Sequence, residues 1–299
     1  MAAPVPTLVG SIVENASDGS VAVPNTTPPA VGDYLVAFIG AYANGGSRAL
    51  DTPVGWTRGV EQDSDEQICA VFTKRAVLAD TTAPSFPFTI SGGGADVFSA
   101  CVIKVTNVPV GSEIAASEID IEDPGSGSLF SYVSNSAAVT AESLALMMFM
   151  GANNGLSAAP TIATYASTPA RSWSELADIG ATNGGSTDPT MAFAVASAPN
   201  TGTSPITLRT AECDLALNDA RRSILIILNG TEDAAGTAAL LAATPTIFTP
   251  VGHAGTSGSA APLQATPTIF VPVGSEDSPS EKWSGEALPE TDWENEPLP

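Results

Sequence analysis

Two apolar runs without polar alternation, each flanked by turn signals, limit the fold of this chain most strongly. The first is GDYLVAFIGAYANGG at residues 32–46, and AESLALMMFMGANNG follows at residues 141–155. A strand that is apolar at consecutive positions is covered on both faces, as in the middle of packed sheets. We therefore expect a buried β-strand at the equivalent place in each of two similar β units.

Other segments extend this match between the two units. The further pairs are SFPFTIS with SPITLRT (residues 85–91 and 204–210) and CVIKVTN with SILIILN (residues 101–107 and 223–229). We predict an all-β, jelly-roll-like β-sandwich over residues 1–230, with half-repeats at 32–108 and 141–230. Leu144–Met150 also has good helix propensity, so its assignment as a strand depends on the match. One shared sandwich and two small domains both remain compatible with the pattern.

The composition favours short strands and many turns. Among 299 residues, 27 are Gly and 24 are Pro, while only 14% are charged. The net charge of −22 repels phosphate backbones, so we expect no nucleic-acid partner. The N-terminus lacks a secretory pattern, and no apolar run is long enough to cross a membrane. We expect a protein that is made in a cytoplasm, stays soluble there until it assembles, and has no membrane partner.

The sequence contains no catalytic motif that we can identify. Its single histidine, His253, lies in a Gly- and Pro-rich spacer, where a catalytic triad would lack a rigid support. The three cysteines, Cys69, Cys101 and Cys213, lie in apolar runs and are interpreted as buried thiols. We predict no enzymatic activity, no cofactor and no metal centre. Calcium binding stays open for two acidic clusters, which are Asp63, Asp65 and Glu66, and Asp120, Glu122 and Asp123.

Residues 231–299 differ from the rest of the chain, and we call them the arm. ATPTIFTPVG at 243–252 returns as ATPTIFVPVG at 265–274, with nine of ten positions identical. WSGEALP at 283–289 and WENEPLP at 293–299 form a second repeat in an acidic stretch. We predict an extended arm that docks on a partner, against the alternative of a disordered tail. Its expected contact residues are Ile247, Phe248, Ile269, Phe270, Trp283 and Trp293.

Several N-terminal segments are similar to virion proteins of tailed bacteriophages. These segments are PTLVGSIV at 6–13, GDYLVAFIGAYA at 32–43, PVGWT at 53–57 and FTKRAVLADTTAPSFPFTIS at 72–91. The resemblance covers about the first 110 residues. It implies a β-rich structural protein in a virion, and it carries no catalytic residues.

Within that setting, we expect a capsid decoration, or cement, protein whose arm docks on neighbouring subunits. Its partners would be the major capsid protein or further copies of itself, with a homo-oligomer such as a trimer as its assembly state. A phage tail or fibre component is the first alternative. A carbohydrate-binding adhesin, with Trp56, Trp173 or Tyr165 as a stacking platform, and an extracellular filament subunit are the others.

Overall fold

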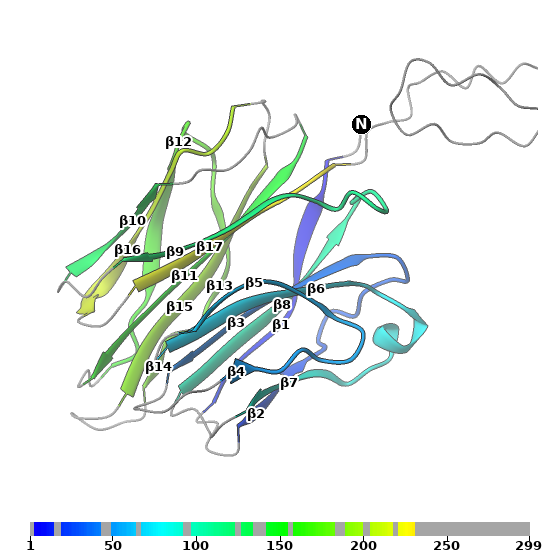
Figure 1. Cartoon of the computed structure of the whole chain (residues 1–299), viewed down its shortest axis with the longest axis horizontal. Coiled ribbons are helices and arrows are strands. Elements are labelled where there is room, and N and C mark those ends of the chain that lie inside the picture. Colours follow the sequence, from blue (N-terminus) through cyan, green and yellow to red (C-terminus); the bar gives the residue numbers. More distant parts are fainter. Residues whose placement is uncertain are drawn as a thin grey trace, which may run out of the picture. The chain divides into compact units, whose positions relative to one another are not determined.

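Four antiparallel β-sheets make up the described part of the chain (Figure 1). The prediction of an all-β, sandwich-like protein is therefore confirmed. The only helical element among the described residues is a short 3-10 helix, η1 (Leu78–Thr81), and that part of the chain contains no helix able to span a membrane. The computed structural model describes residues 3–14, 19–42, 49–63, 67–91, 97–122, 127–133, 142–154, 158–182, 189–199, 204–217 and 221–230.

The first half of the chain forms two sheets. The larger has the strand order β1-β8-β3-β6-β5, and the smaller has the order β2-β7-β4. The strands are β1 (Val5–Glu14), β2 (Ser20–Pro24), β3 (Tyr34–Tyr42), β4 (Ala49–Leu50), β5 (Thr57–Asp63), β6 (Gln67–Arg75), β7 (Ser85–Ser91) and β8 (Val97–Thr106).

The second half forms another large and another small sheet. Their orders are β9-β17-β11-β15-β13, with β14 also paired to β15, and β10-β16-β12. The strands are β9 (Ile114–Glu122), β10 (Gly127–Val133), β11 (Leu144–Asn154), β12 (Ile162–Thr168), β13 (Ser174–Asp178), β14 (Ala181–Thr182), β15 (Pro189–Pro199), β16 (Leu208–Leu217) and β17 (Arg221–Leu228).

The two halves share one strand order. When β14 is set aside, each strand of the first half has a counterpart of the same rank in the second, and the counterparts pair with the same neighbours. The segments matched in the sequence fall on such counterparts, namely β3 with β11, β7 with β16 and β8 with β17. The equal strand order shows that the segments matched in the sequence occupy equivalent places in the two halves.

The four sheets form stacked layers, because apolar side chains cover both faces of each large sheet. Leu35, Ala37 and Ile39 of β3 pack toward the small sheet of the first half, whereas Val36 and Phe38 point into a cluster shared with β11 and β15. β11 divides its side chains in the same way between that shared cluster and the small sheet of the second half. All of β3 is buried, so the expectation of a strand covered on both faces is confirmed.

The contact between the halves is close. A Cβ atom added to Gly40 would lie 2.7 Å from Sδ of Met150 and 2.8 Å from the ring of Phe193. Arg222 of β17, which is fully buried, donates from Nε to Oε1 of Gln67 on β6 at 3.2 Å. Apolar packing and a buried polar contact therefore both join the two large sheets.

Three of the longer strands, β5, β10 and β12, have no clear strand signal in the sequence, and β10 begins in a segment that the sequence indicates is a loop. Residues 124–128, PGSGS, are typical of a loop, but Gly127 and Ser128 begin β10. Further along β10, Phe130 and Tyr132 are buried and alternate with exposed residues, so burial of alternate side chains extends the strand into a Gly- and Ser-rich stretch. The other two unexpected strands, β5 and β12, are edge strands with register shifts.

Candidate functional site

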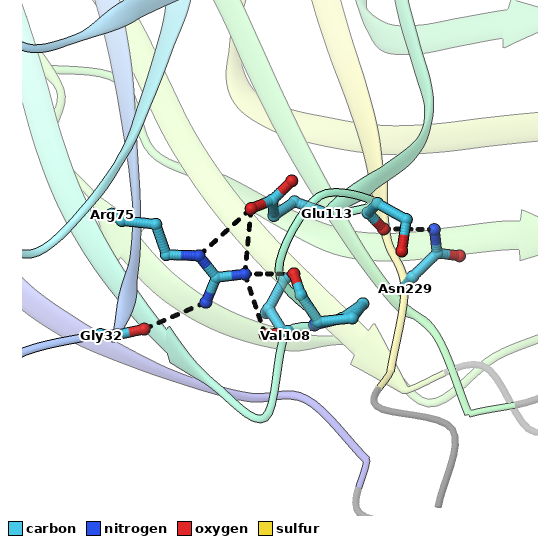
Figure 2. A network of polar contacts seen from close by, with 7 residues as sticks. Gly32, Arg75, Val108, Glu113 and Asn229 are labelled. Carbon is cyan, nitrogen blue, oxygen red and sulfur yellow. Dashed lines mark hydrogen bonds and ion pairs between the residues drawn. The ribbon is translucent and has the colours of Figure 1, made fainter. Parts of the chain in front are cut away.

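Arg75 lies at the centre of a polar network where the two halves are connected (Figure 2). Its Nη1 donates to the carbonyl of Gly32 at 3.0 Å, and its Nη2 donates to the carbonyls of Val108, at 2.9 Å, and Pro109. Nε and Nη2 also donate to Oε1 of Glu113, at 3.2 and 3.1 Å. One guanidinium thus joins the turn before β3, the end of β6 and the connection from β8 to β9.

The local sequence explains why this network forms. Gly32 has a φ of +92°, a left-handed conformation that glycine adopts readily, and its N–H donates to the carbonyl of Ala76 at 2.9 Å. The Arg75 guanidinium also lies 5.1 Å from the centre of the Tyr34 ring. Several carbonyls and a carboxylate around one planar group suit the fixed fork of arginine, which lysine does not reproduce.

The same connection fixes the end of β17. Asn229 donates from Nδ2 to the carbonyl of Ser112 at 2.7 Å, and from its backbone N–H to the carbonyl of Glu113 at 2.9 Å. Burial raises the pKa of the Glu113 carboxyl, but backbone N–H groups and Arg75 outweigh this effect and hold that pKa below its ordinary value. Glu113 is therefore a charged partner of Arg75 at neutral pH.

Exposed apolar residues occur close in sequence to several residues of this network. Val31 precedes Gly32, Val77 follows Ala76, and Val110 follows Pro109, so each is adjacent in sequence to a residue of the network. Together with Leu78, these side chains are between 56% and 86% exposed. Exposed apolar side chains mark a surface that binds another polypeptide when they form one contiguous patch.

A second polar network is buried in the other half. The Arg209 side chain is fully buried, and its Nη2 donates to Oδ2 of Asp120 at 2.6 Å. Its Nε donates to Oγ of Ser223 at 2.8 Å, and Nη1 lies 3.6 Å from Oε2 of Glu118. Burial lowers the pKa of Arg209, while the two carboxylates oppose that change. Asp120, one of the residues considered for calcium binding, therefore serves as a partner of this arginine.

Asp178, at the end of β13, is an acid in an unfavourable environment. Oδ2 accepts a hydrogen bond from the N–H of Ile162 at 3.1 Å, whereas Oδ1 is buried and has no hydrogen-bond partner among the described residues. Burial raises the pKa of Asp178 to about 6; the Ile162 N–H opposes this change, and the nearby Glu175 and Asp214 carboxylates reinforce it.

The Asp178→Asn variant is expected to be more stable than the parent at neutral pH. Because the folded-state pKa of about 6 exceeds the ordinary value of 3.8, the folded chain holds a proton that the unfolded chain releases. Stability then falls as the pH rises through that window, and the loss persists above it. The variant should regain about 1 kcal/mol at pH 7, since solvent screens a half-buried carboxylate.

Urea unfolding of Asp178→Asn at pH 4 and pH 7 measures this difference. Glu212→Gln, which makes the same charge change at an exposed position on β16, is the matched control. An Asp178→Asn variant whose gain in stability is the same at both pH values would contradict the assignment.

The aromatic residues considered for carbohydrate stacking are packed to different extents. Trp56 is only 8% exposed and packs on Phe86 and Phe88, as expected for a core residue. Trp173 and Tyr165 are partly buried against the core of the second half. Trp173 donates from Nε1 to Oγ of Ser167 at 3.0 Å, and Tyr165 donates from its hydroxyl to the carbonyl of Ile162 at 2.9 Å. None of the three forms an exposed, coplanar platform with another.

The remaining predicted residues divide between core and undescribed positions. All three cysteines are free and buried, as interpreted from the sequence. Burial raises the thiol pKa of Cys69 to about 11 and that of Cys101 to about 12. Within the ranges that the structure describes, no three His, Cys, Asp or Glu side chains are grouped to hold a metal ion. Outside those ranges lie His253, Asp65, Glu66, Asp123 and the six arm residues Ile247, Phe248, Ile269, Phe270, Trp283 and Trp293.

Comparison with protein-family models, curated proteins and solved structures found no match. The resemblance of the N-terminal segments to phage virion proteins therefore stays a prediction. What the chain does must be argued from its fold and its surfaces.

Proposed function

We propose that this protein is a non-enzymatic virion structural protein, and specifically a capsid decoration protein whose arm docks on neighbouring subunits. The strand order carries the proposal. In a jelly roll of eight strands, the first, eighth, third and sixth form one sheet, and the second, seventh, fourth and fifth form the other. This fold is common among viral capsid proteins.

Both halves of the chain support a jelly-roll assignment. The first half contains the order β1-β8-β3-β6 opposite β2-β7-β4, and the second contains β9-β17-β11-β15 opposite β10-β16-β12. The fifth strand departs from the pattern in each half, because β5 pairs with β6 and β13 pairs with β15. A departure that occurs at the same rank in both halves supports a repeated unit.

The arm supplies the second argument. Its two ATPTIF segments are near-identical and start 22 residues apart, so one chain presents the same short apolar ligand twice. Two linked ligands bind an array of repeated subunits more tightly than either does alone, provided that the spacer reaches both sites. The surface of a capsid is such an array. The partners proposed are the major capsid protein and neighbouring copies, with the virion as location.

Deleting residues 243–299 is expected to lower occupancy on the shell and the heat resistance of the particle. We expect the apparent affinity for shells stripped of the protein to fall by about tenfold or more, because avidity is lost. The matched control keeps the arm but replaces Ile247, Phe248, Ile269 and Phe270 with serine, and should show the same loss. Unchanged occupancy and heat resistance in both variants would overturn the proposed role of the arm.

A further inference from the structure

β10 is an edge strand with an uncharged and exposed outer face. It ends the strand order β10-β16-β12 and, among the described strands, pairs only with β16 (Figure 1). Its seven residues, GSLFSYV, include no charged residue and no proline. Leu129 is 49% and Val133 is 68% exposed, and Ser131 between them is exposed as well. An apolar edge strand of this kind is a template for pairing with another chain.

The other edge strands in the described part of the chain carry features that hinder such pairing. Charge, proline, a short length and an interrupted register are the usual features of this kind. They are acids in β5, β9 and β13, Pro6 in β1, Pro24 in β2, a length of two residues in β4 and β14, and a register shift in β12. β10 has none of them from Leu129 to Val133, because its own register shift lies between Gly127 and Leu129.

A second copy of the chain is the partner that these features favour. The net charge of −22 makes two copies repel each other wherever both present acids. β10 presents none, and its Ser131 and Val133 lie opposite the uncharged Thr210 and Leu208 on β16. Pairing with a second β10 needs no other surface, because a two-fold contact uses the same patch on both copies.

Antiparallel pairing about Ser131 gives the best match of side chains. Ser131 of one copy then lies opposite Ser131 of the other, Leu129 lies opposite Val133, and Phe130 lies opposite Tyr132. Apolar and aromatic cross-strand pairs stabilise an antiparallel sheet. A pairing about Phe130 would instead set Leu129 against Ser131, so the apolar side chains favour the first register.

Charged groups beside β10 do not oppose this pairing. Arg221 donates from Nη1 to the carbonyl of Leu129 and so holds the start of the strand in place. Arg209, opposite Tyr132, is buried and paired with two acids. Glu212 lies opposite Leu129, and the two copies of Glu212 would be about 20 Å apart, three strand spacings across and four residues along. This distance exceeds the Debye length of about 8 Å, so their repulsion is largely screened.

From these observations we infer that β10 pairs antiparallel with β10 of a second copy, about a two-fold axis at Ser131. The two three-stranded sheets then form one continuous sheet across the dimer. The contact forms in solution, and the inference rests on the proposed function only for its use on a shell, where it links neighbouring copies.

Sedimentation velocity of the full-length protein over a wide range of concentration tests the contact. We expect a dimer whose share rises with concentration. Ser131→Lys places two ammonium groups at the two-fold axis and should raise the dissociation constant about tenfold or more. Ala166→Lys makes the same charge change at an exposed position on β12, the opposite edge of the same sheet, and should leave the constant unchanged.

Cysteine crosslinking tests the register. The three native cysteines are buried, so an introduced surface thiol is the one that reacts under mild oxidation. Residues opposite each other in an antiparallel pair have Cα atoms about 5 Å apart, which a disulfide can bridge. Ser131→Cys should therefore form a disulfide-linked dimer. Thr210→Cys should not, because the two positions would be about 14 Å apart.

Other outcomes overturn the inference. These are a protein that stays monomeric at every concentration, an oligomer that Ser131→Lys and Ala166→Lys weaken equally, or a disulfide that forms as readily from Thr210→Cys as from Ser131→Cys. If no such dimer is found but deletion of the arm lowers shell occupancy, only the inference fails. If the dimer is found but the deletion has no effect on shells, only the proposed role of the arm fails.

Discussion

Replacing Gly10 with alanine is expected to destabilise the folded chain by about 3 kcal/mol. The added Cβ atom would lie 1.8 Å from the backbone carbonyl oxygen of Pro24. Backbone at this point cannot shift easily, because the neighbouring Val9 carbonyl accepts hydrogen bonds from the N–H groups of Thr26 and Thr27, both at 3.1 Å. Pro24 is the last residue of β2, so β1 passes the end of β2 at this position. The pairing of β1 with β8 also shifts register here, between Leu8 and Gly10.

Chemical denaturation of Gly10→Ala and Gly59→Ala, compared with the parent, measures this effect. At Gly59 on β5 the added Cβ atom would lie 2.8 Å from Cγ1 of Val71, a side chain that is able to move. We therefore expect Gly59→Ala to cost clearly less than Gly10→Ala. Equal losses for the two variants would show that the close approach of β1 to Pro24 is not as described.

Neutralising both acids beside Arg209 is expected to cost more stability than removing the arginine itself. The Glu118→Gln and Asp120→Asn double variant keeps side-chain shape but leaves a fully buried guanidinium without a counter-charge. A loss of about 3 kcal/mol or more is expected when a buried charge is left unpaired. Arg209→Met removes the buried charge, and the two carboxylates, which are partly exposed, regain contact with water.

Thermal and urea unfolding of the two proteins provide the comparison. We expect Arg209→Met to lose about 1–2 kcal/mol, from its hydrogen bonds and packing. Combining Arg209→Met with the two acid replacements should recover part of the loss seen for the acids alone. If Arg209→Met is the more damaging change, the arginine stabilises the fold mainly through packing, and its buried charge matters less than its shape.

The central strands could be predicted because their signal is local. Consecutive apolar residues in β3 and β11 follow directly from burial of both faces, and the structure places both strands in the middle of the large sheets. The helix propensity of Leu144–Met150 is overridden because its side chains fill two apolar layers at alternate positions. β5 and β12 escaped prediction because edge strands with register shifts have weaker alternation.

The Arg75 network could not be predicted, because its partners are distant in the sequence. The residues that it contacts lie 33 to 43 positions away, in turns whose sequences have no distinctive motif. The only local signal is a basic residue at the end of an apolar strand, in a chain with ten basic residues. The arm is the reverse case, since its repeats are plain in the sequence and lie outside the described residues.

The structure of the protein in its native assembly tests the account most directly, by showing what residues 244–299 contact. We expect Ile269 and Phe270 to pack against another protein chain, at the same place in each copy around the shell. An arm that touches only its own chain, or a chain absent from the shell altogether, would contradict the account. In the first case, a fibre or adhesin role would become the better explanation of the β-sandwich.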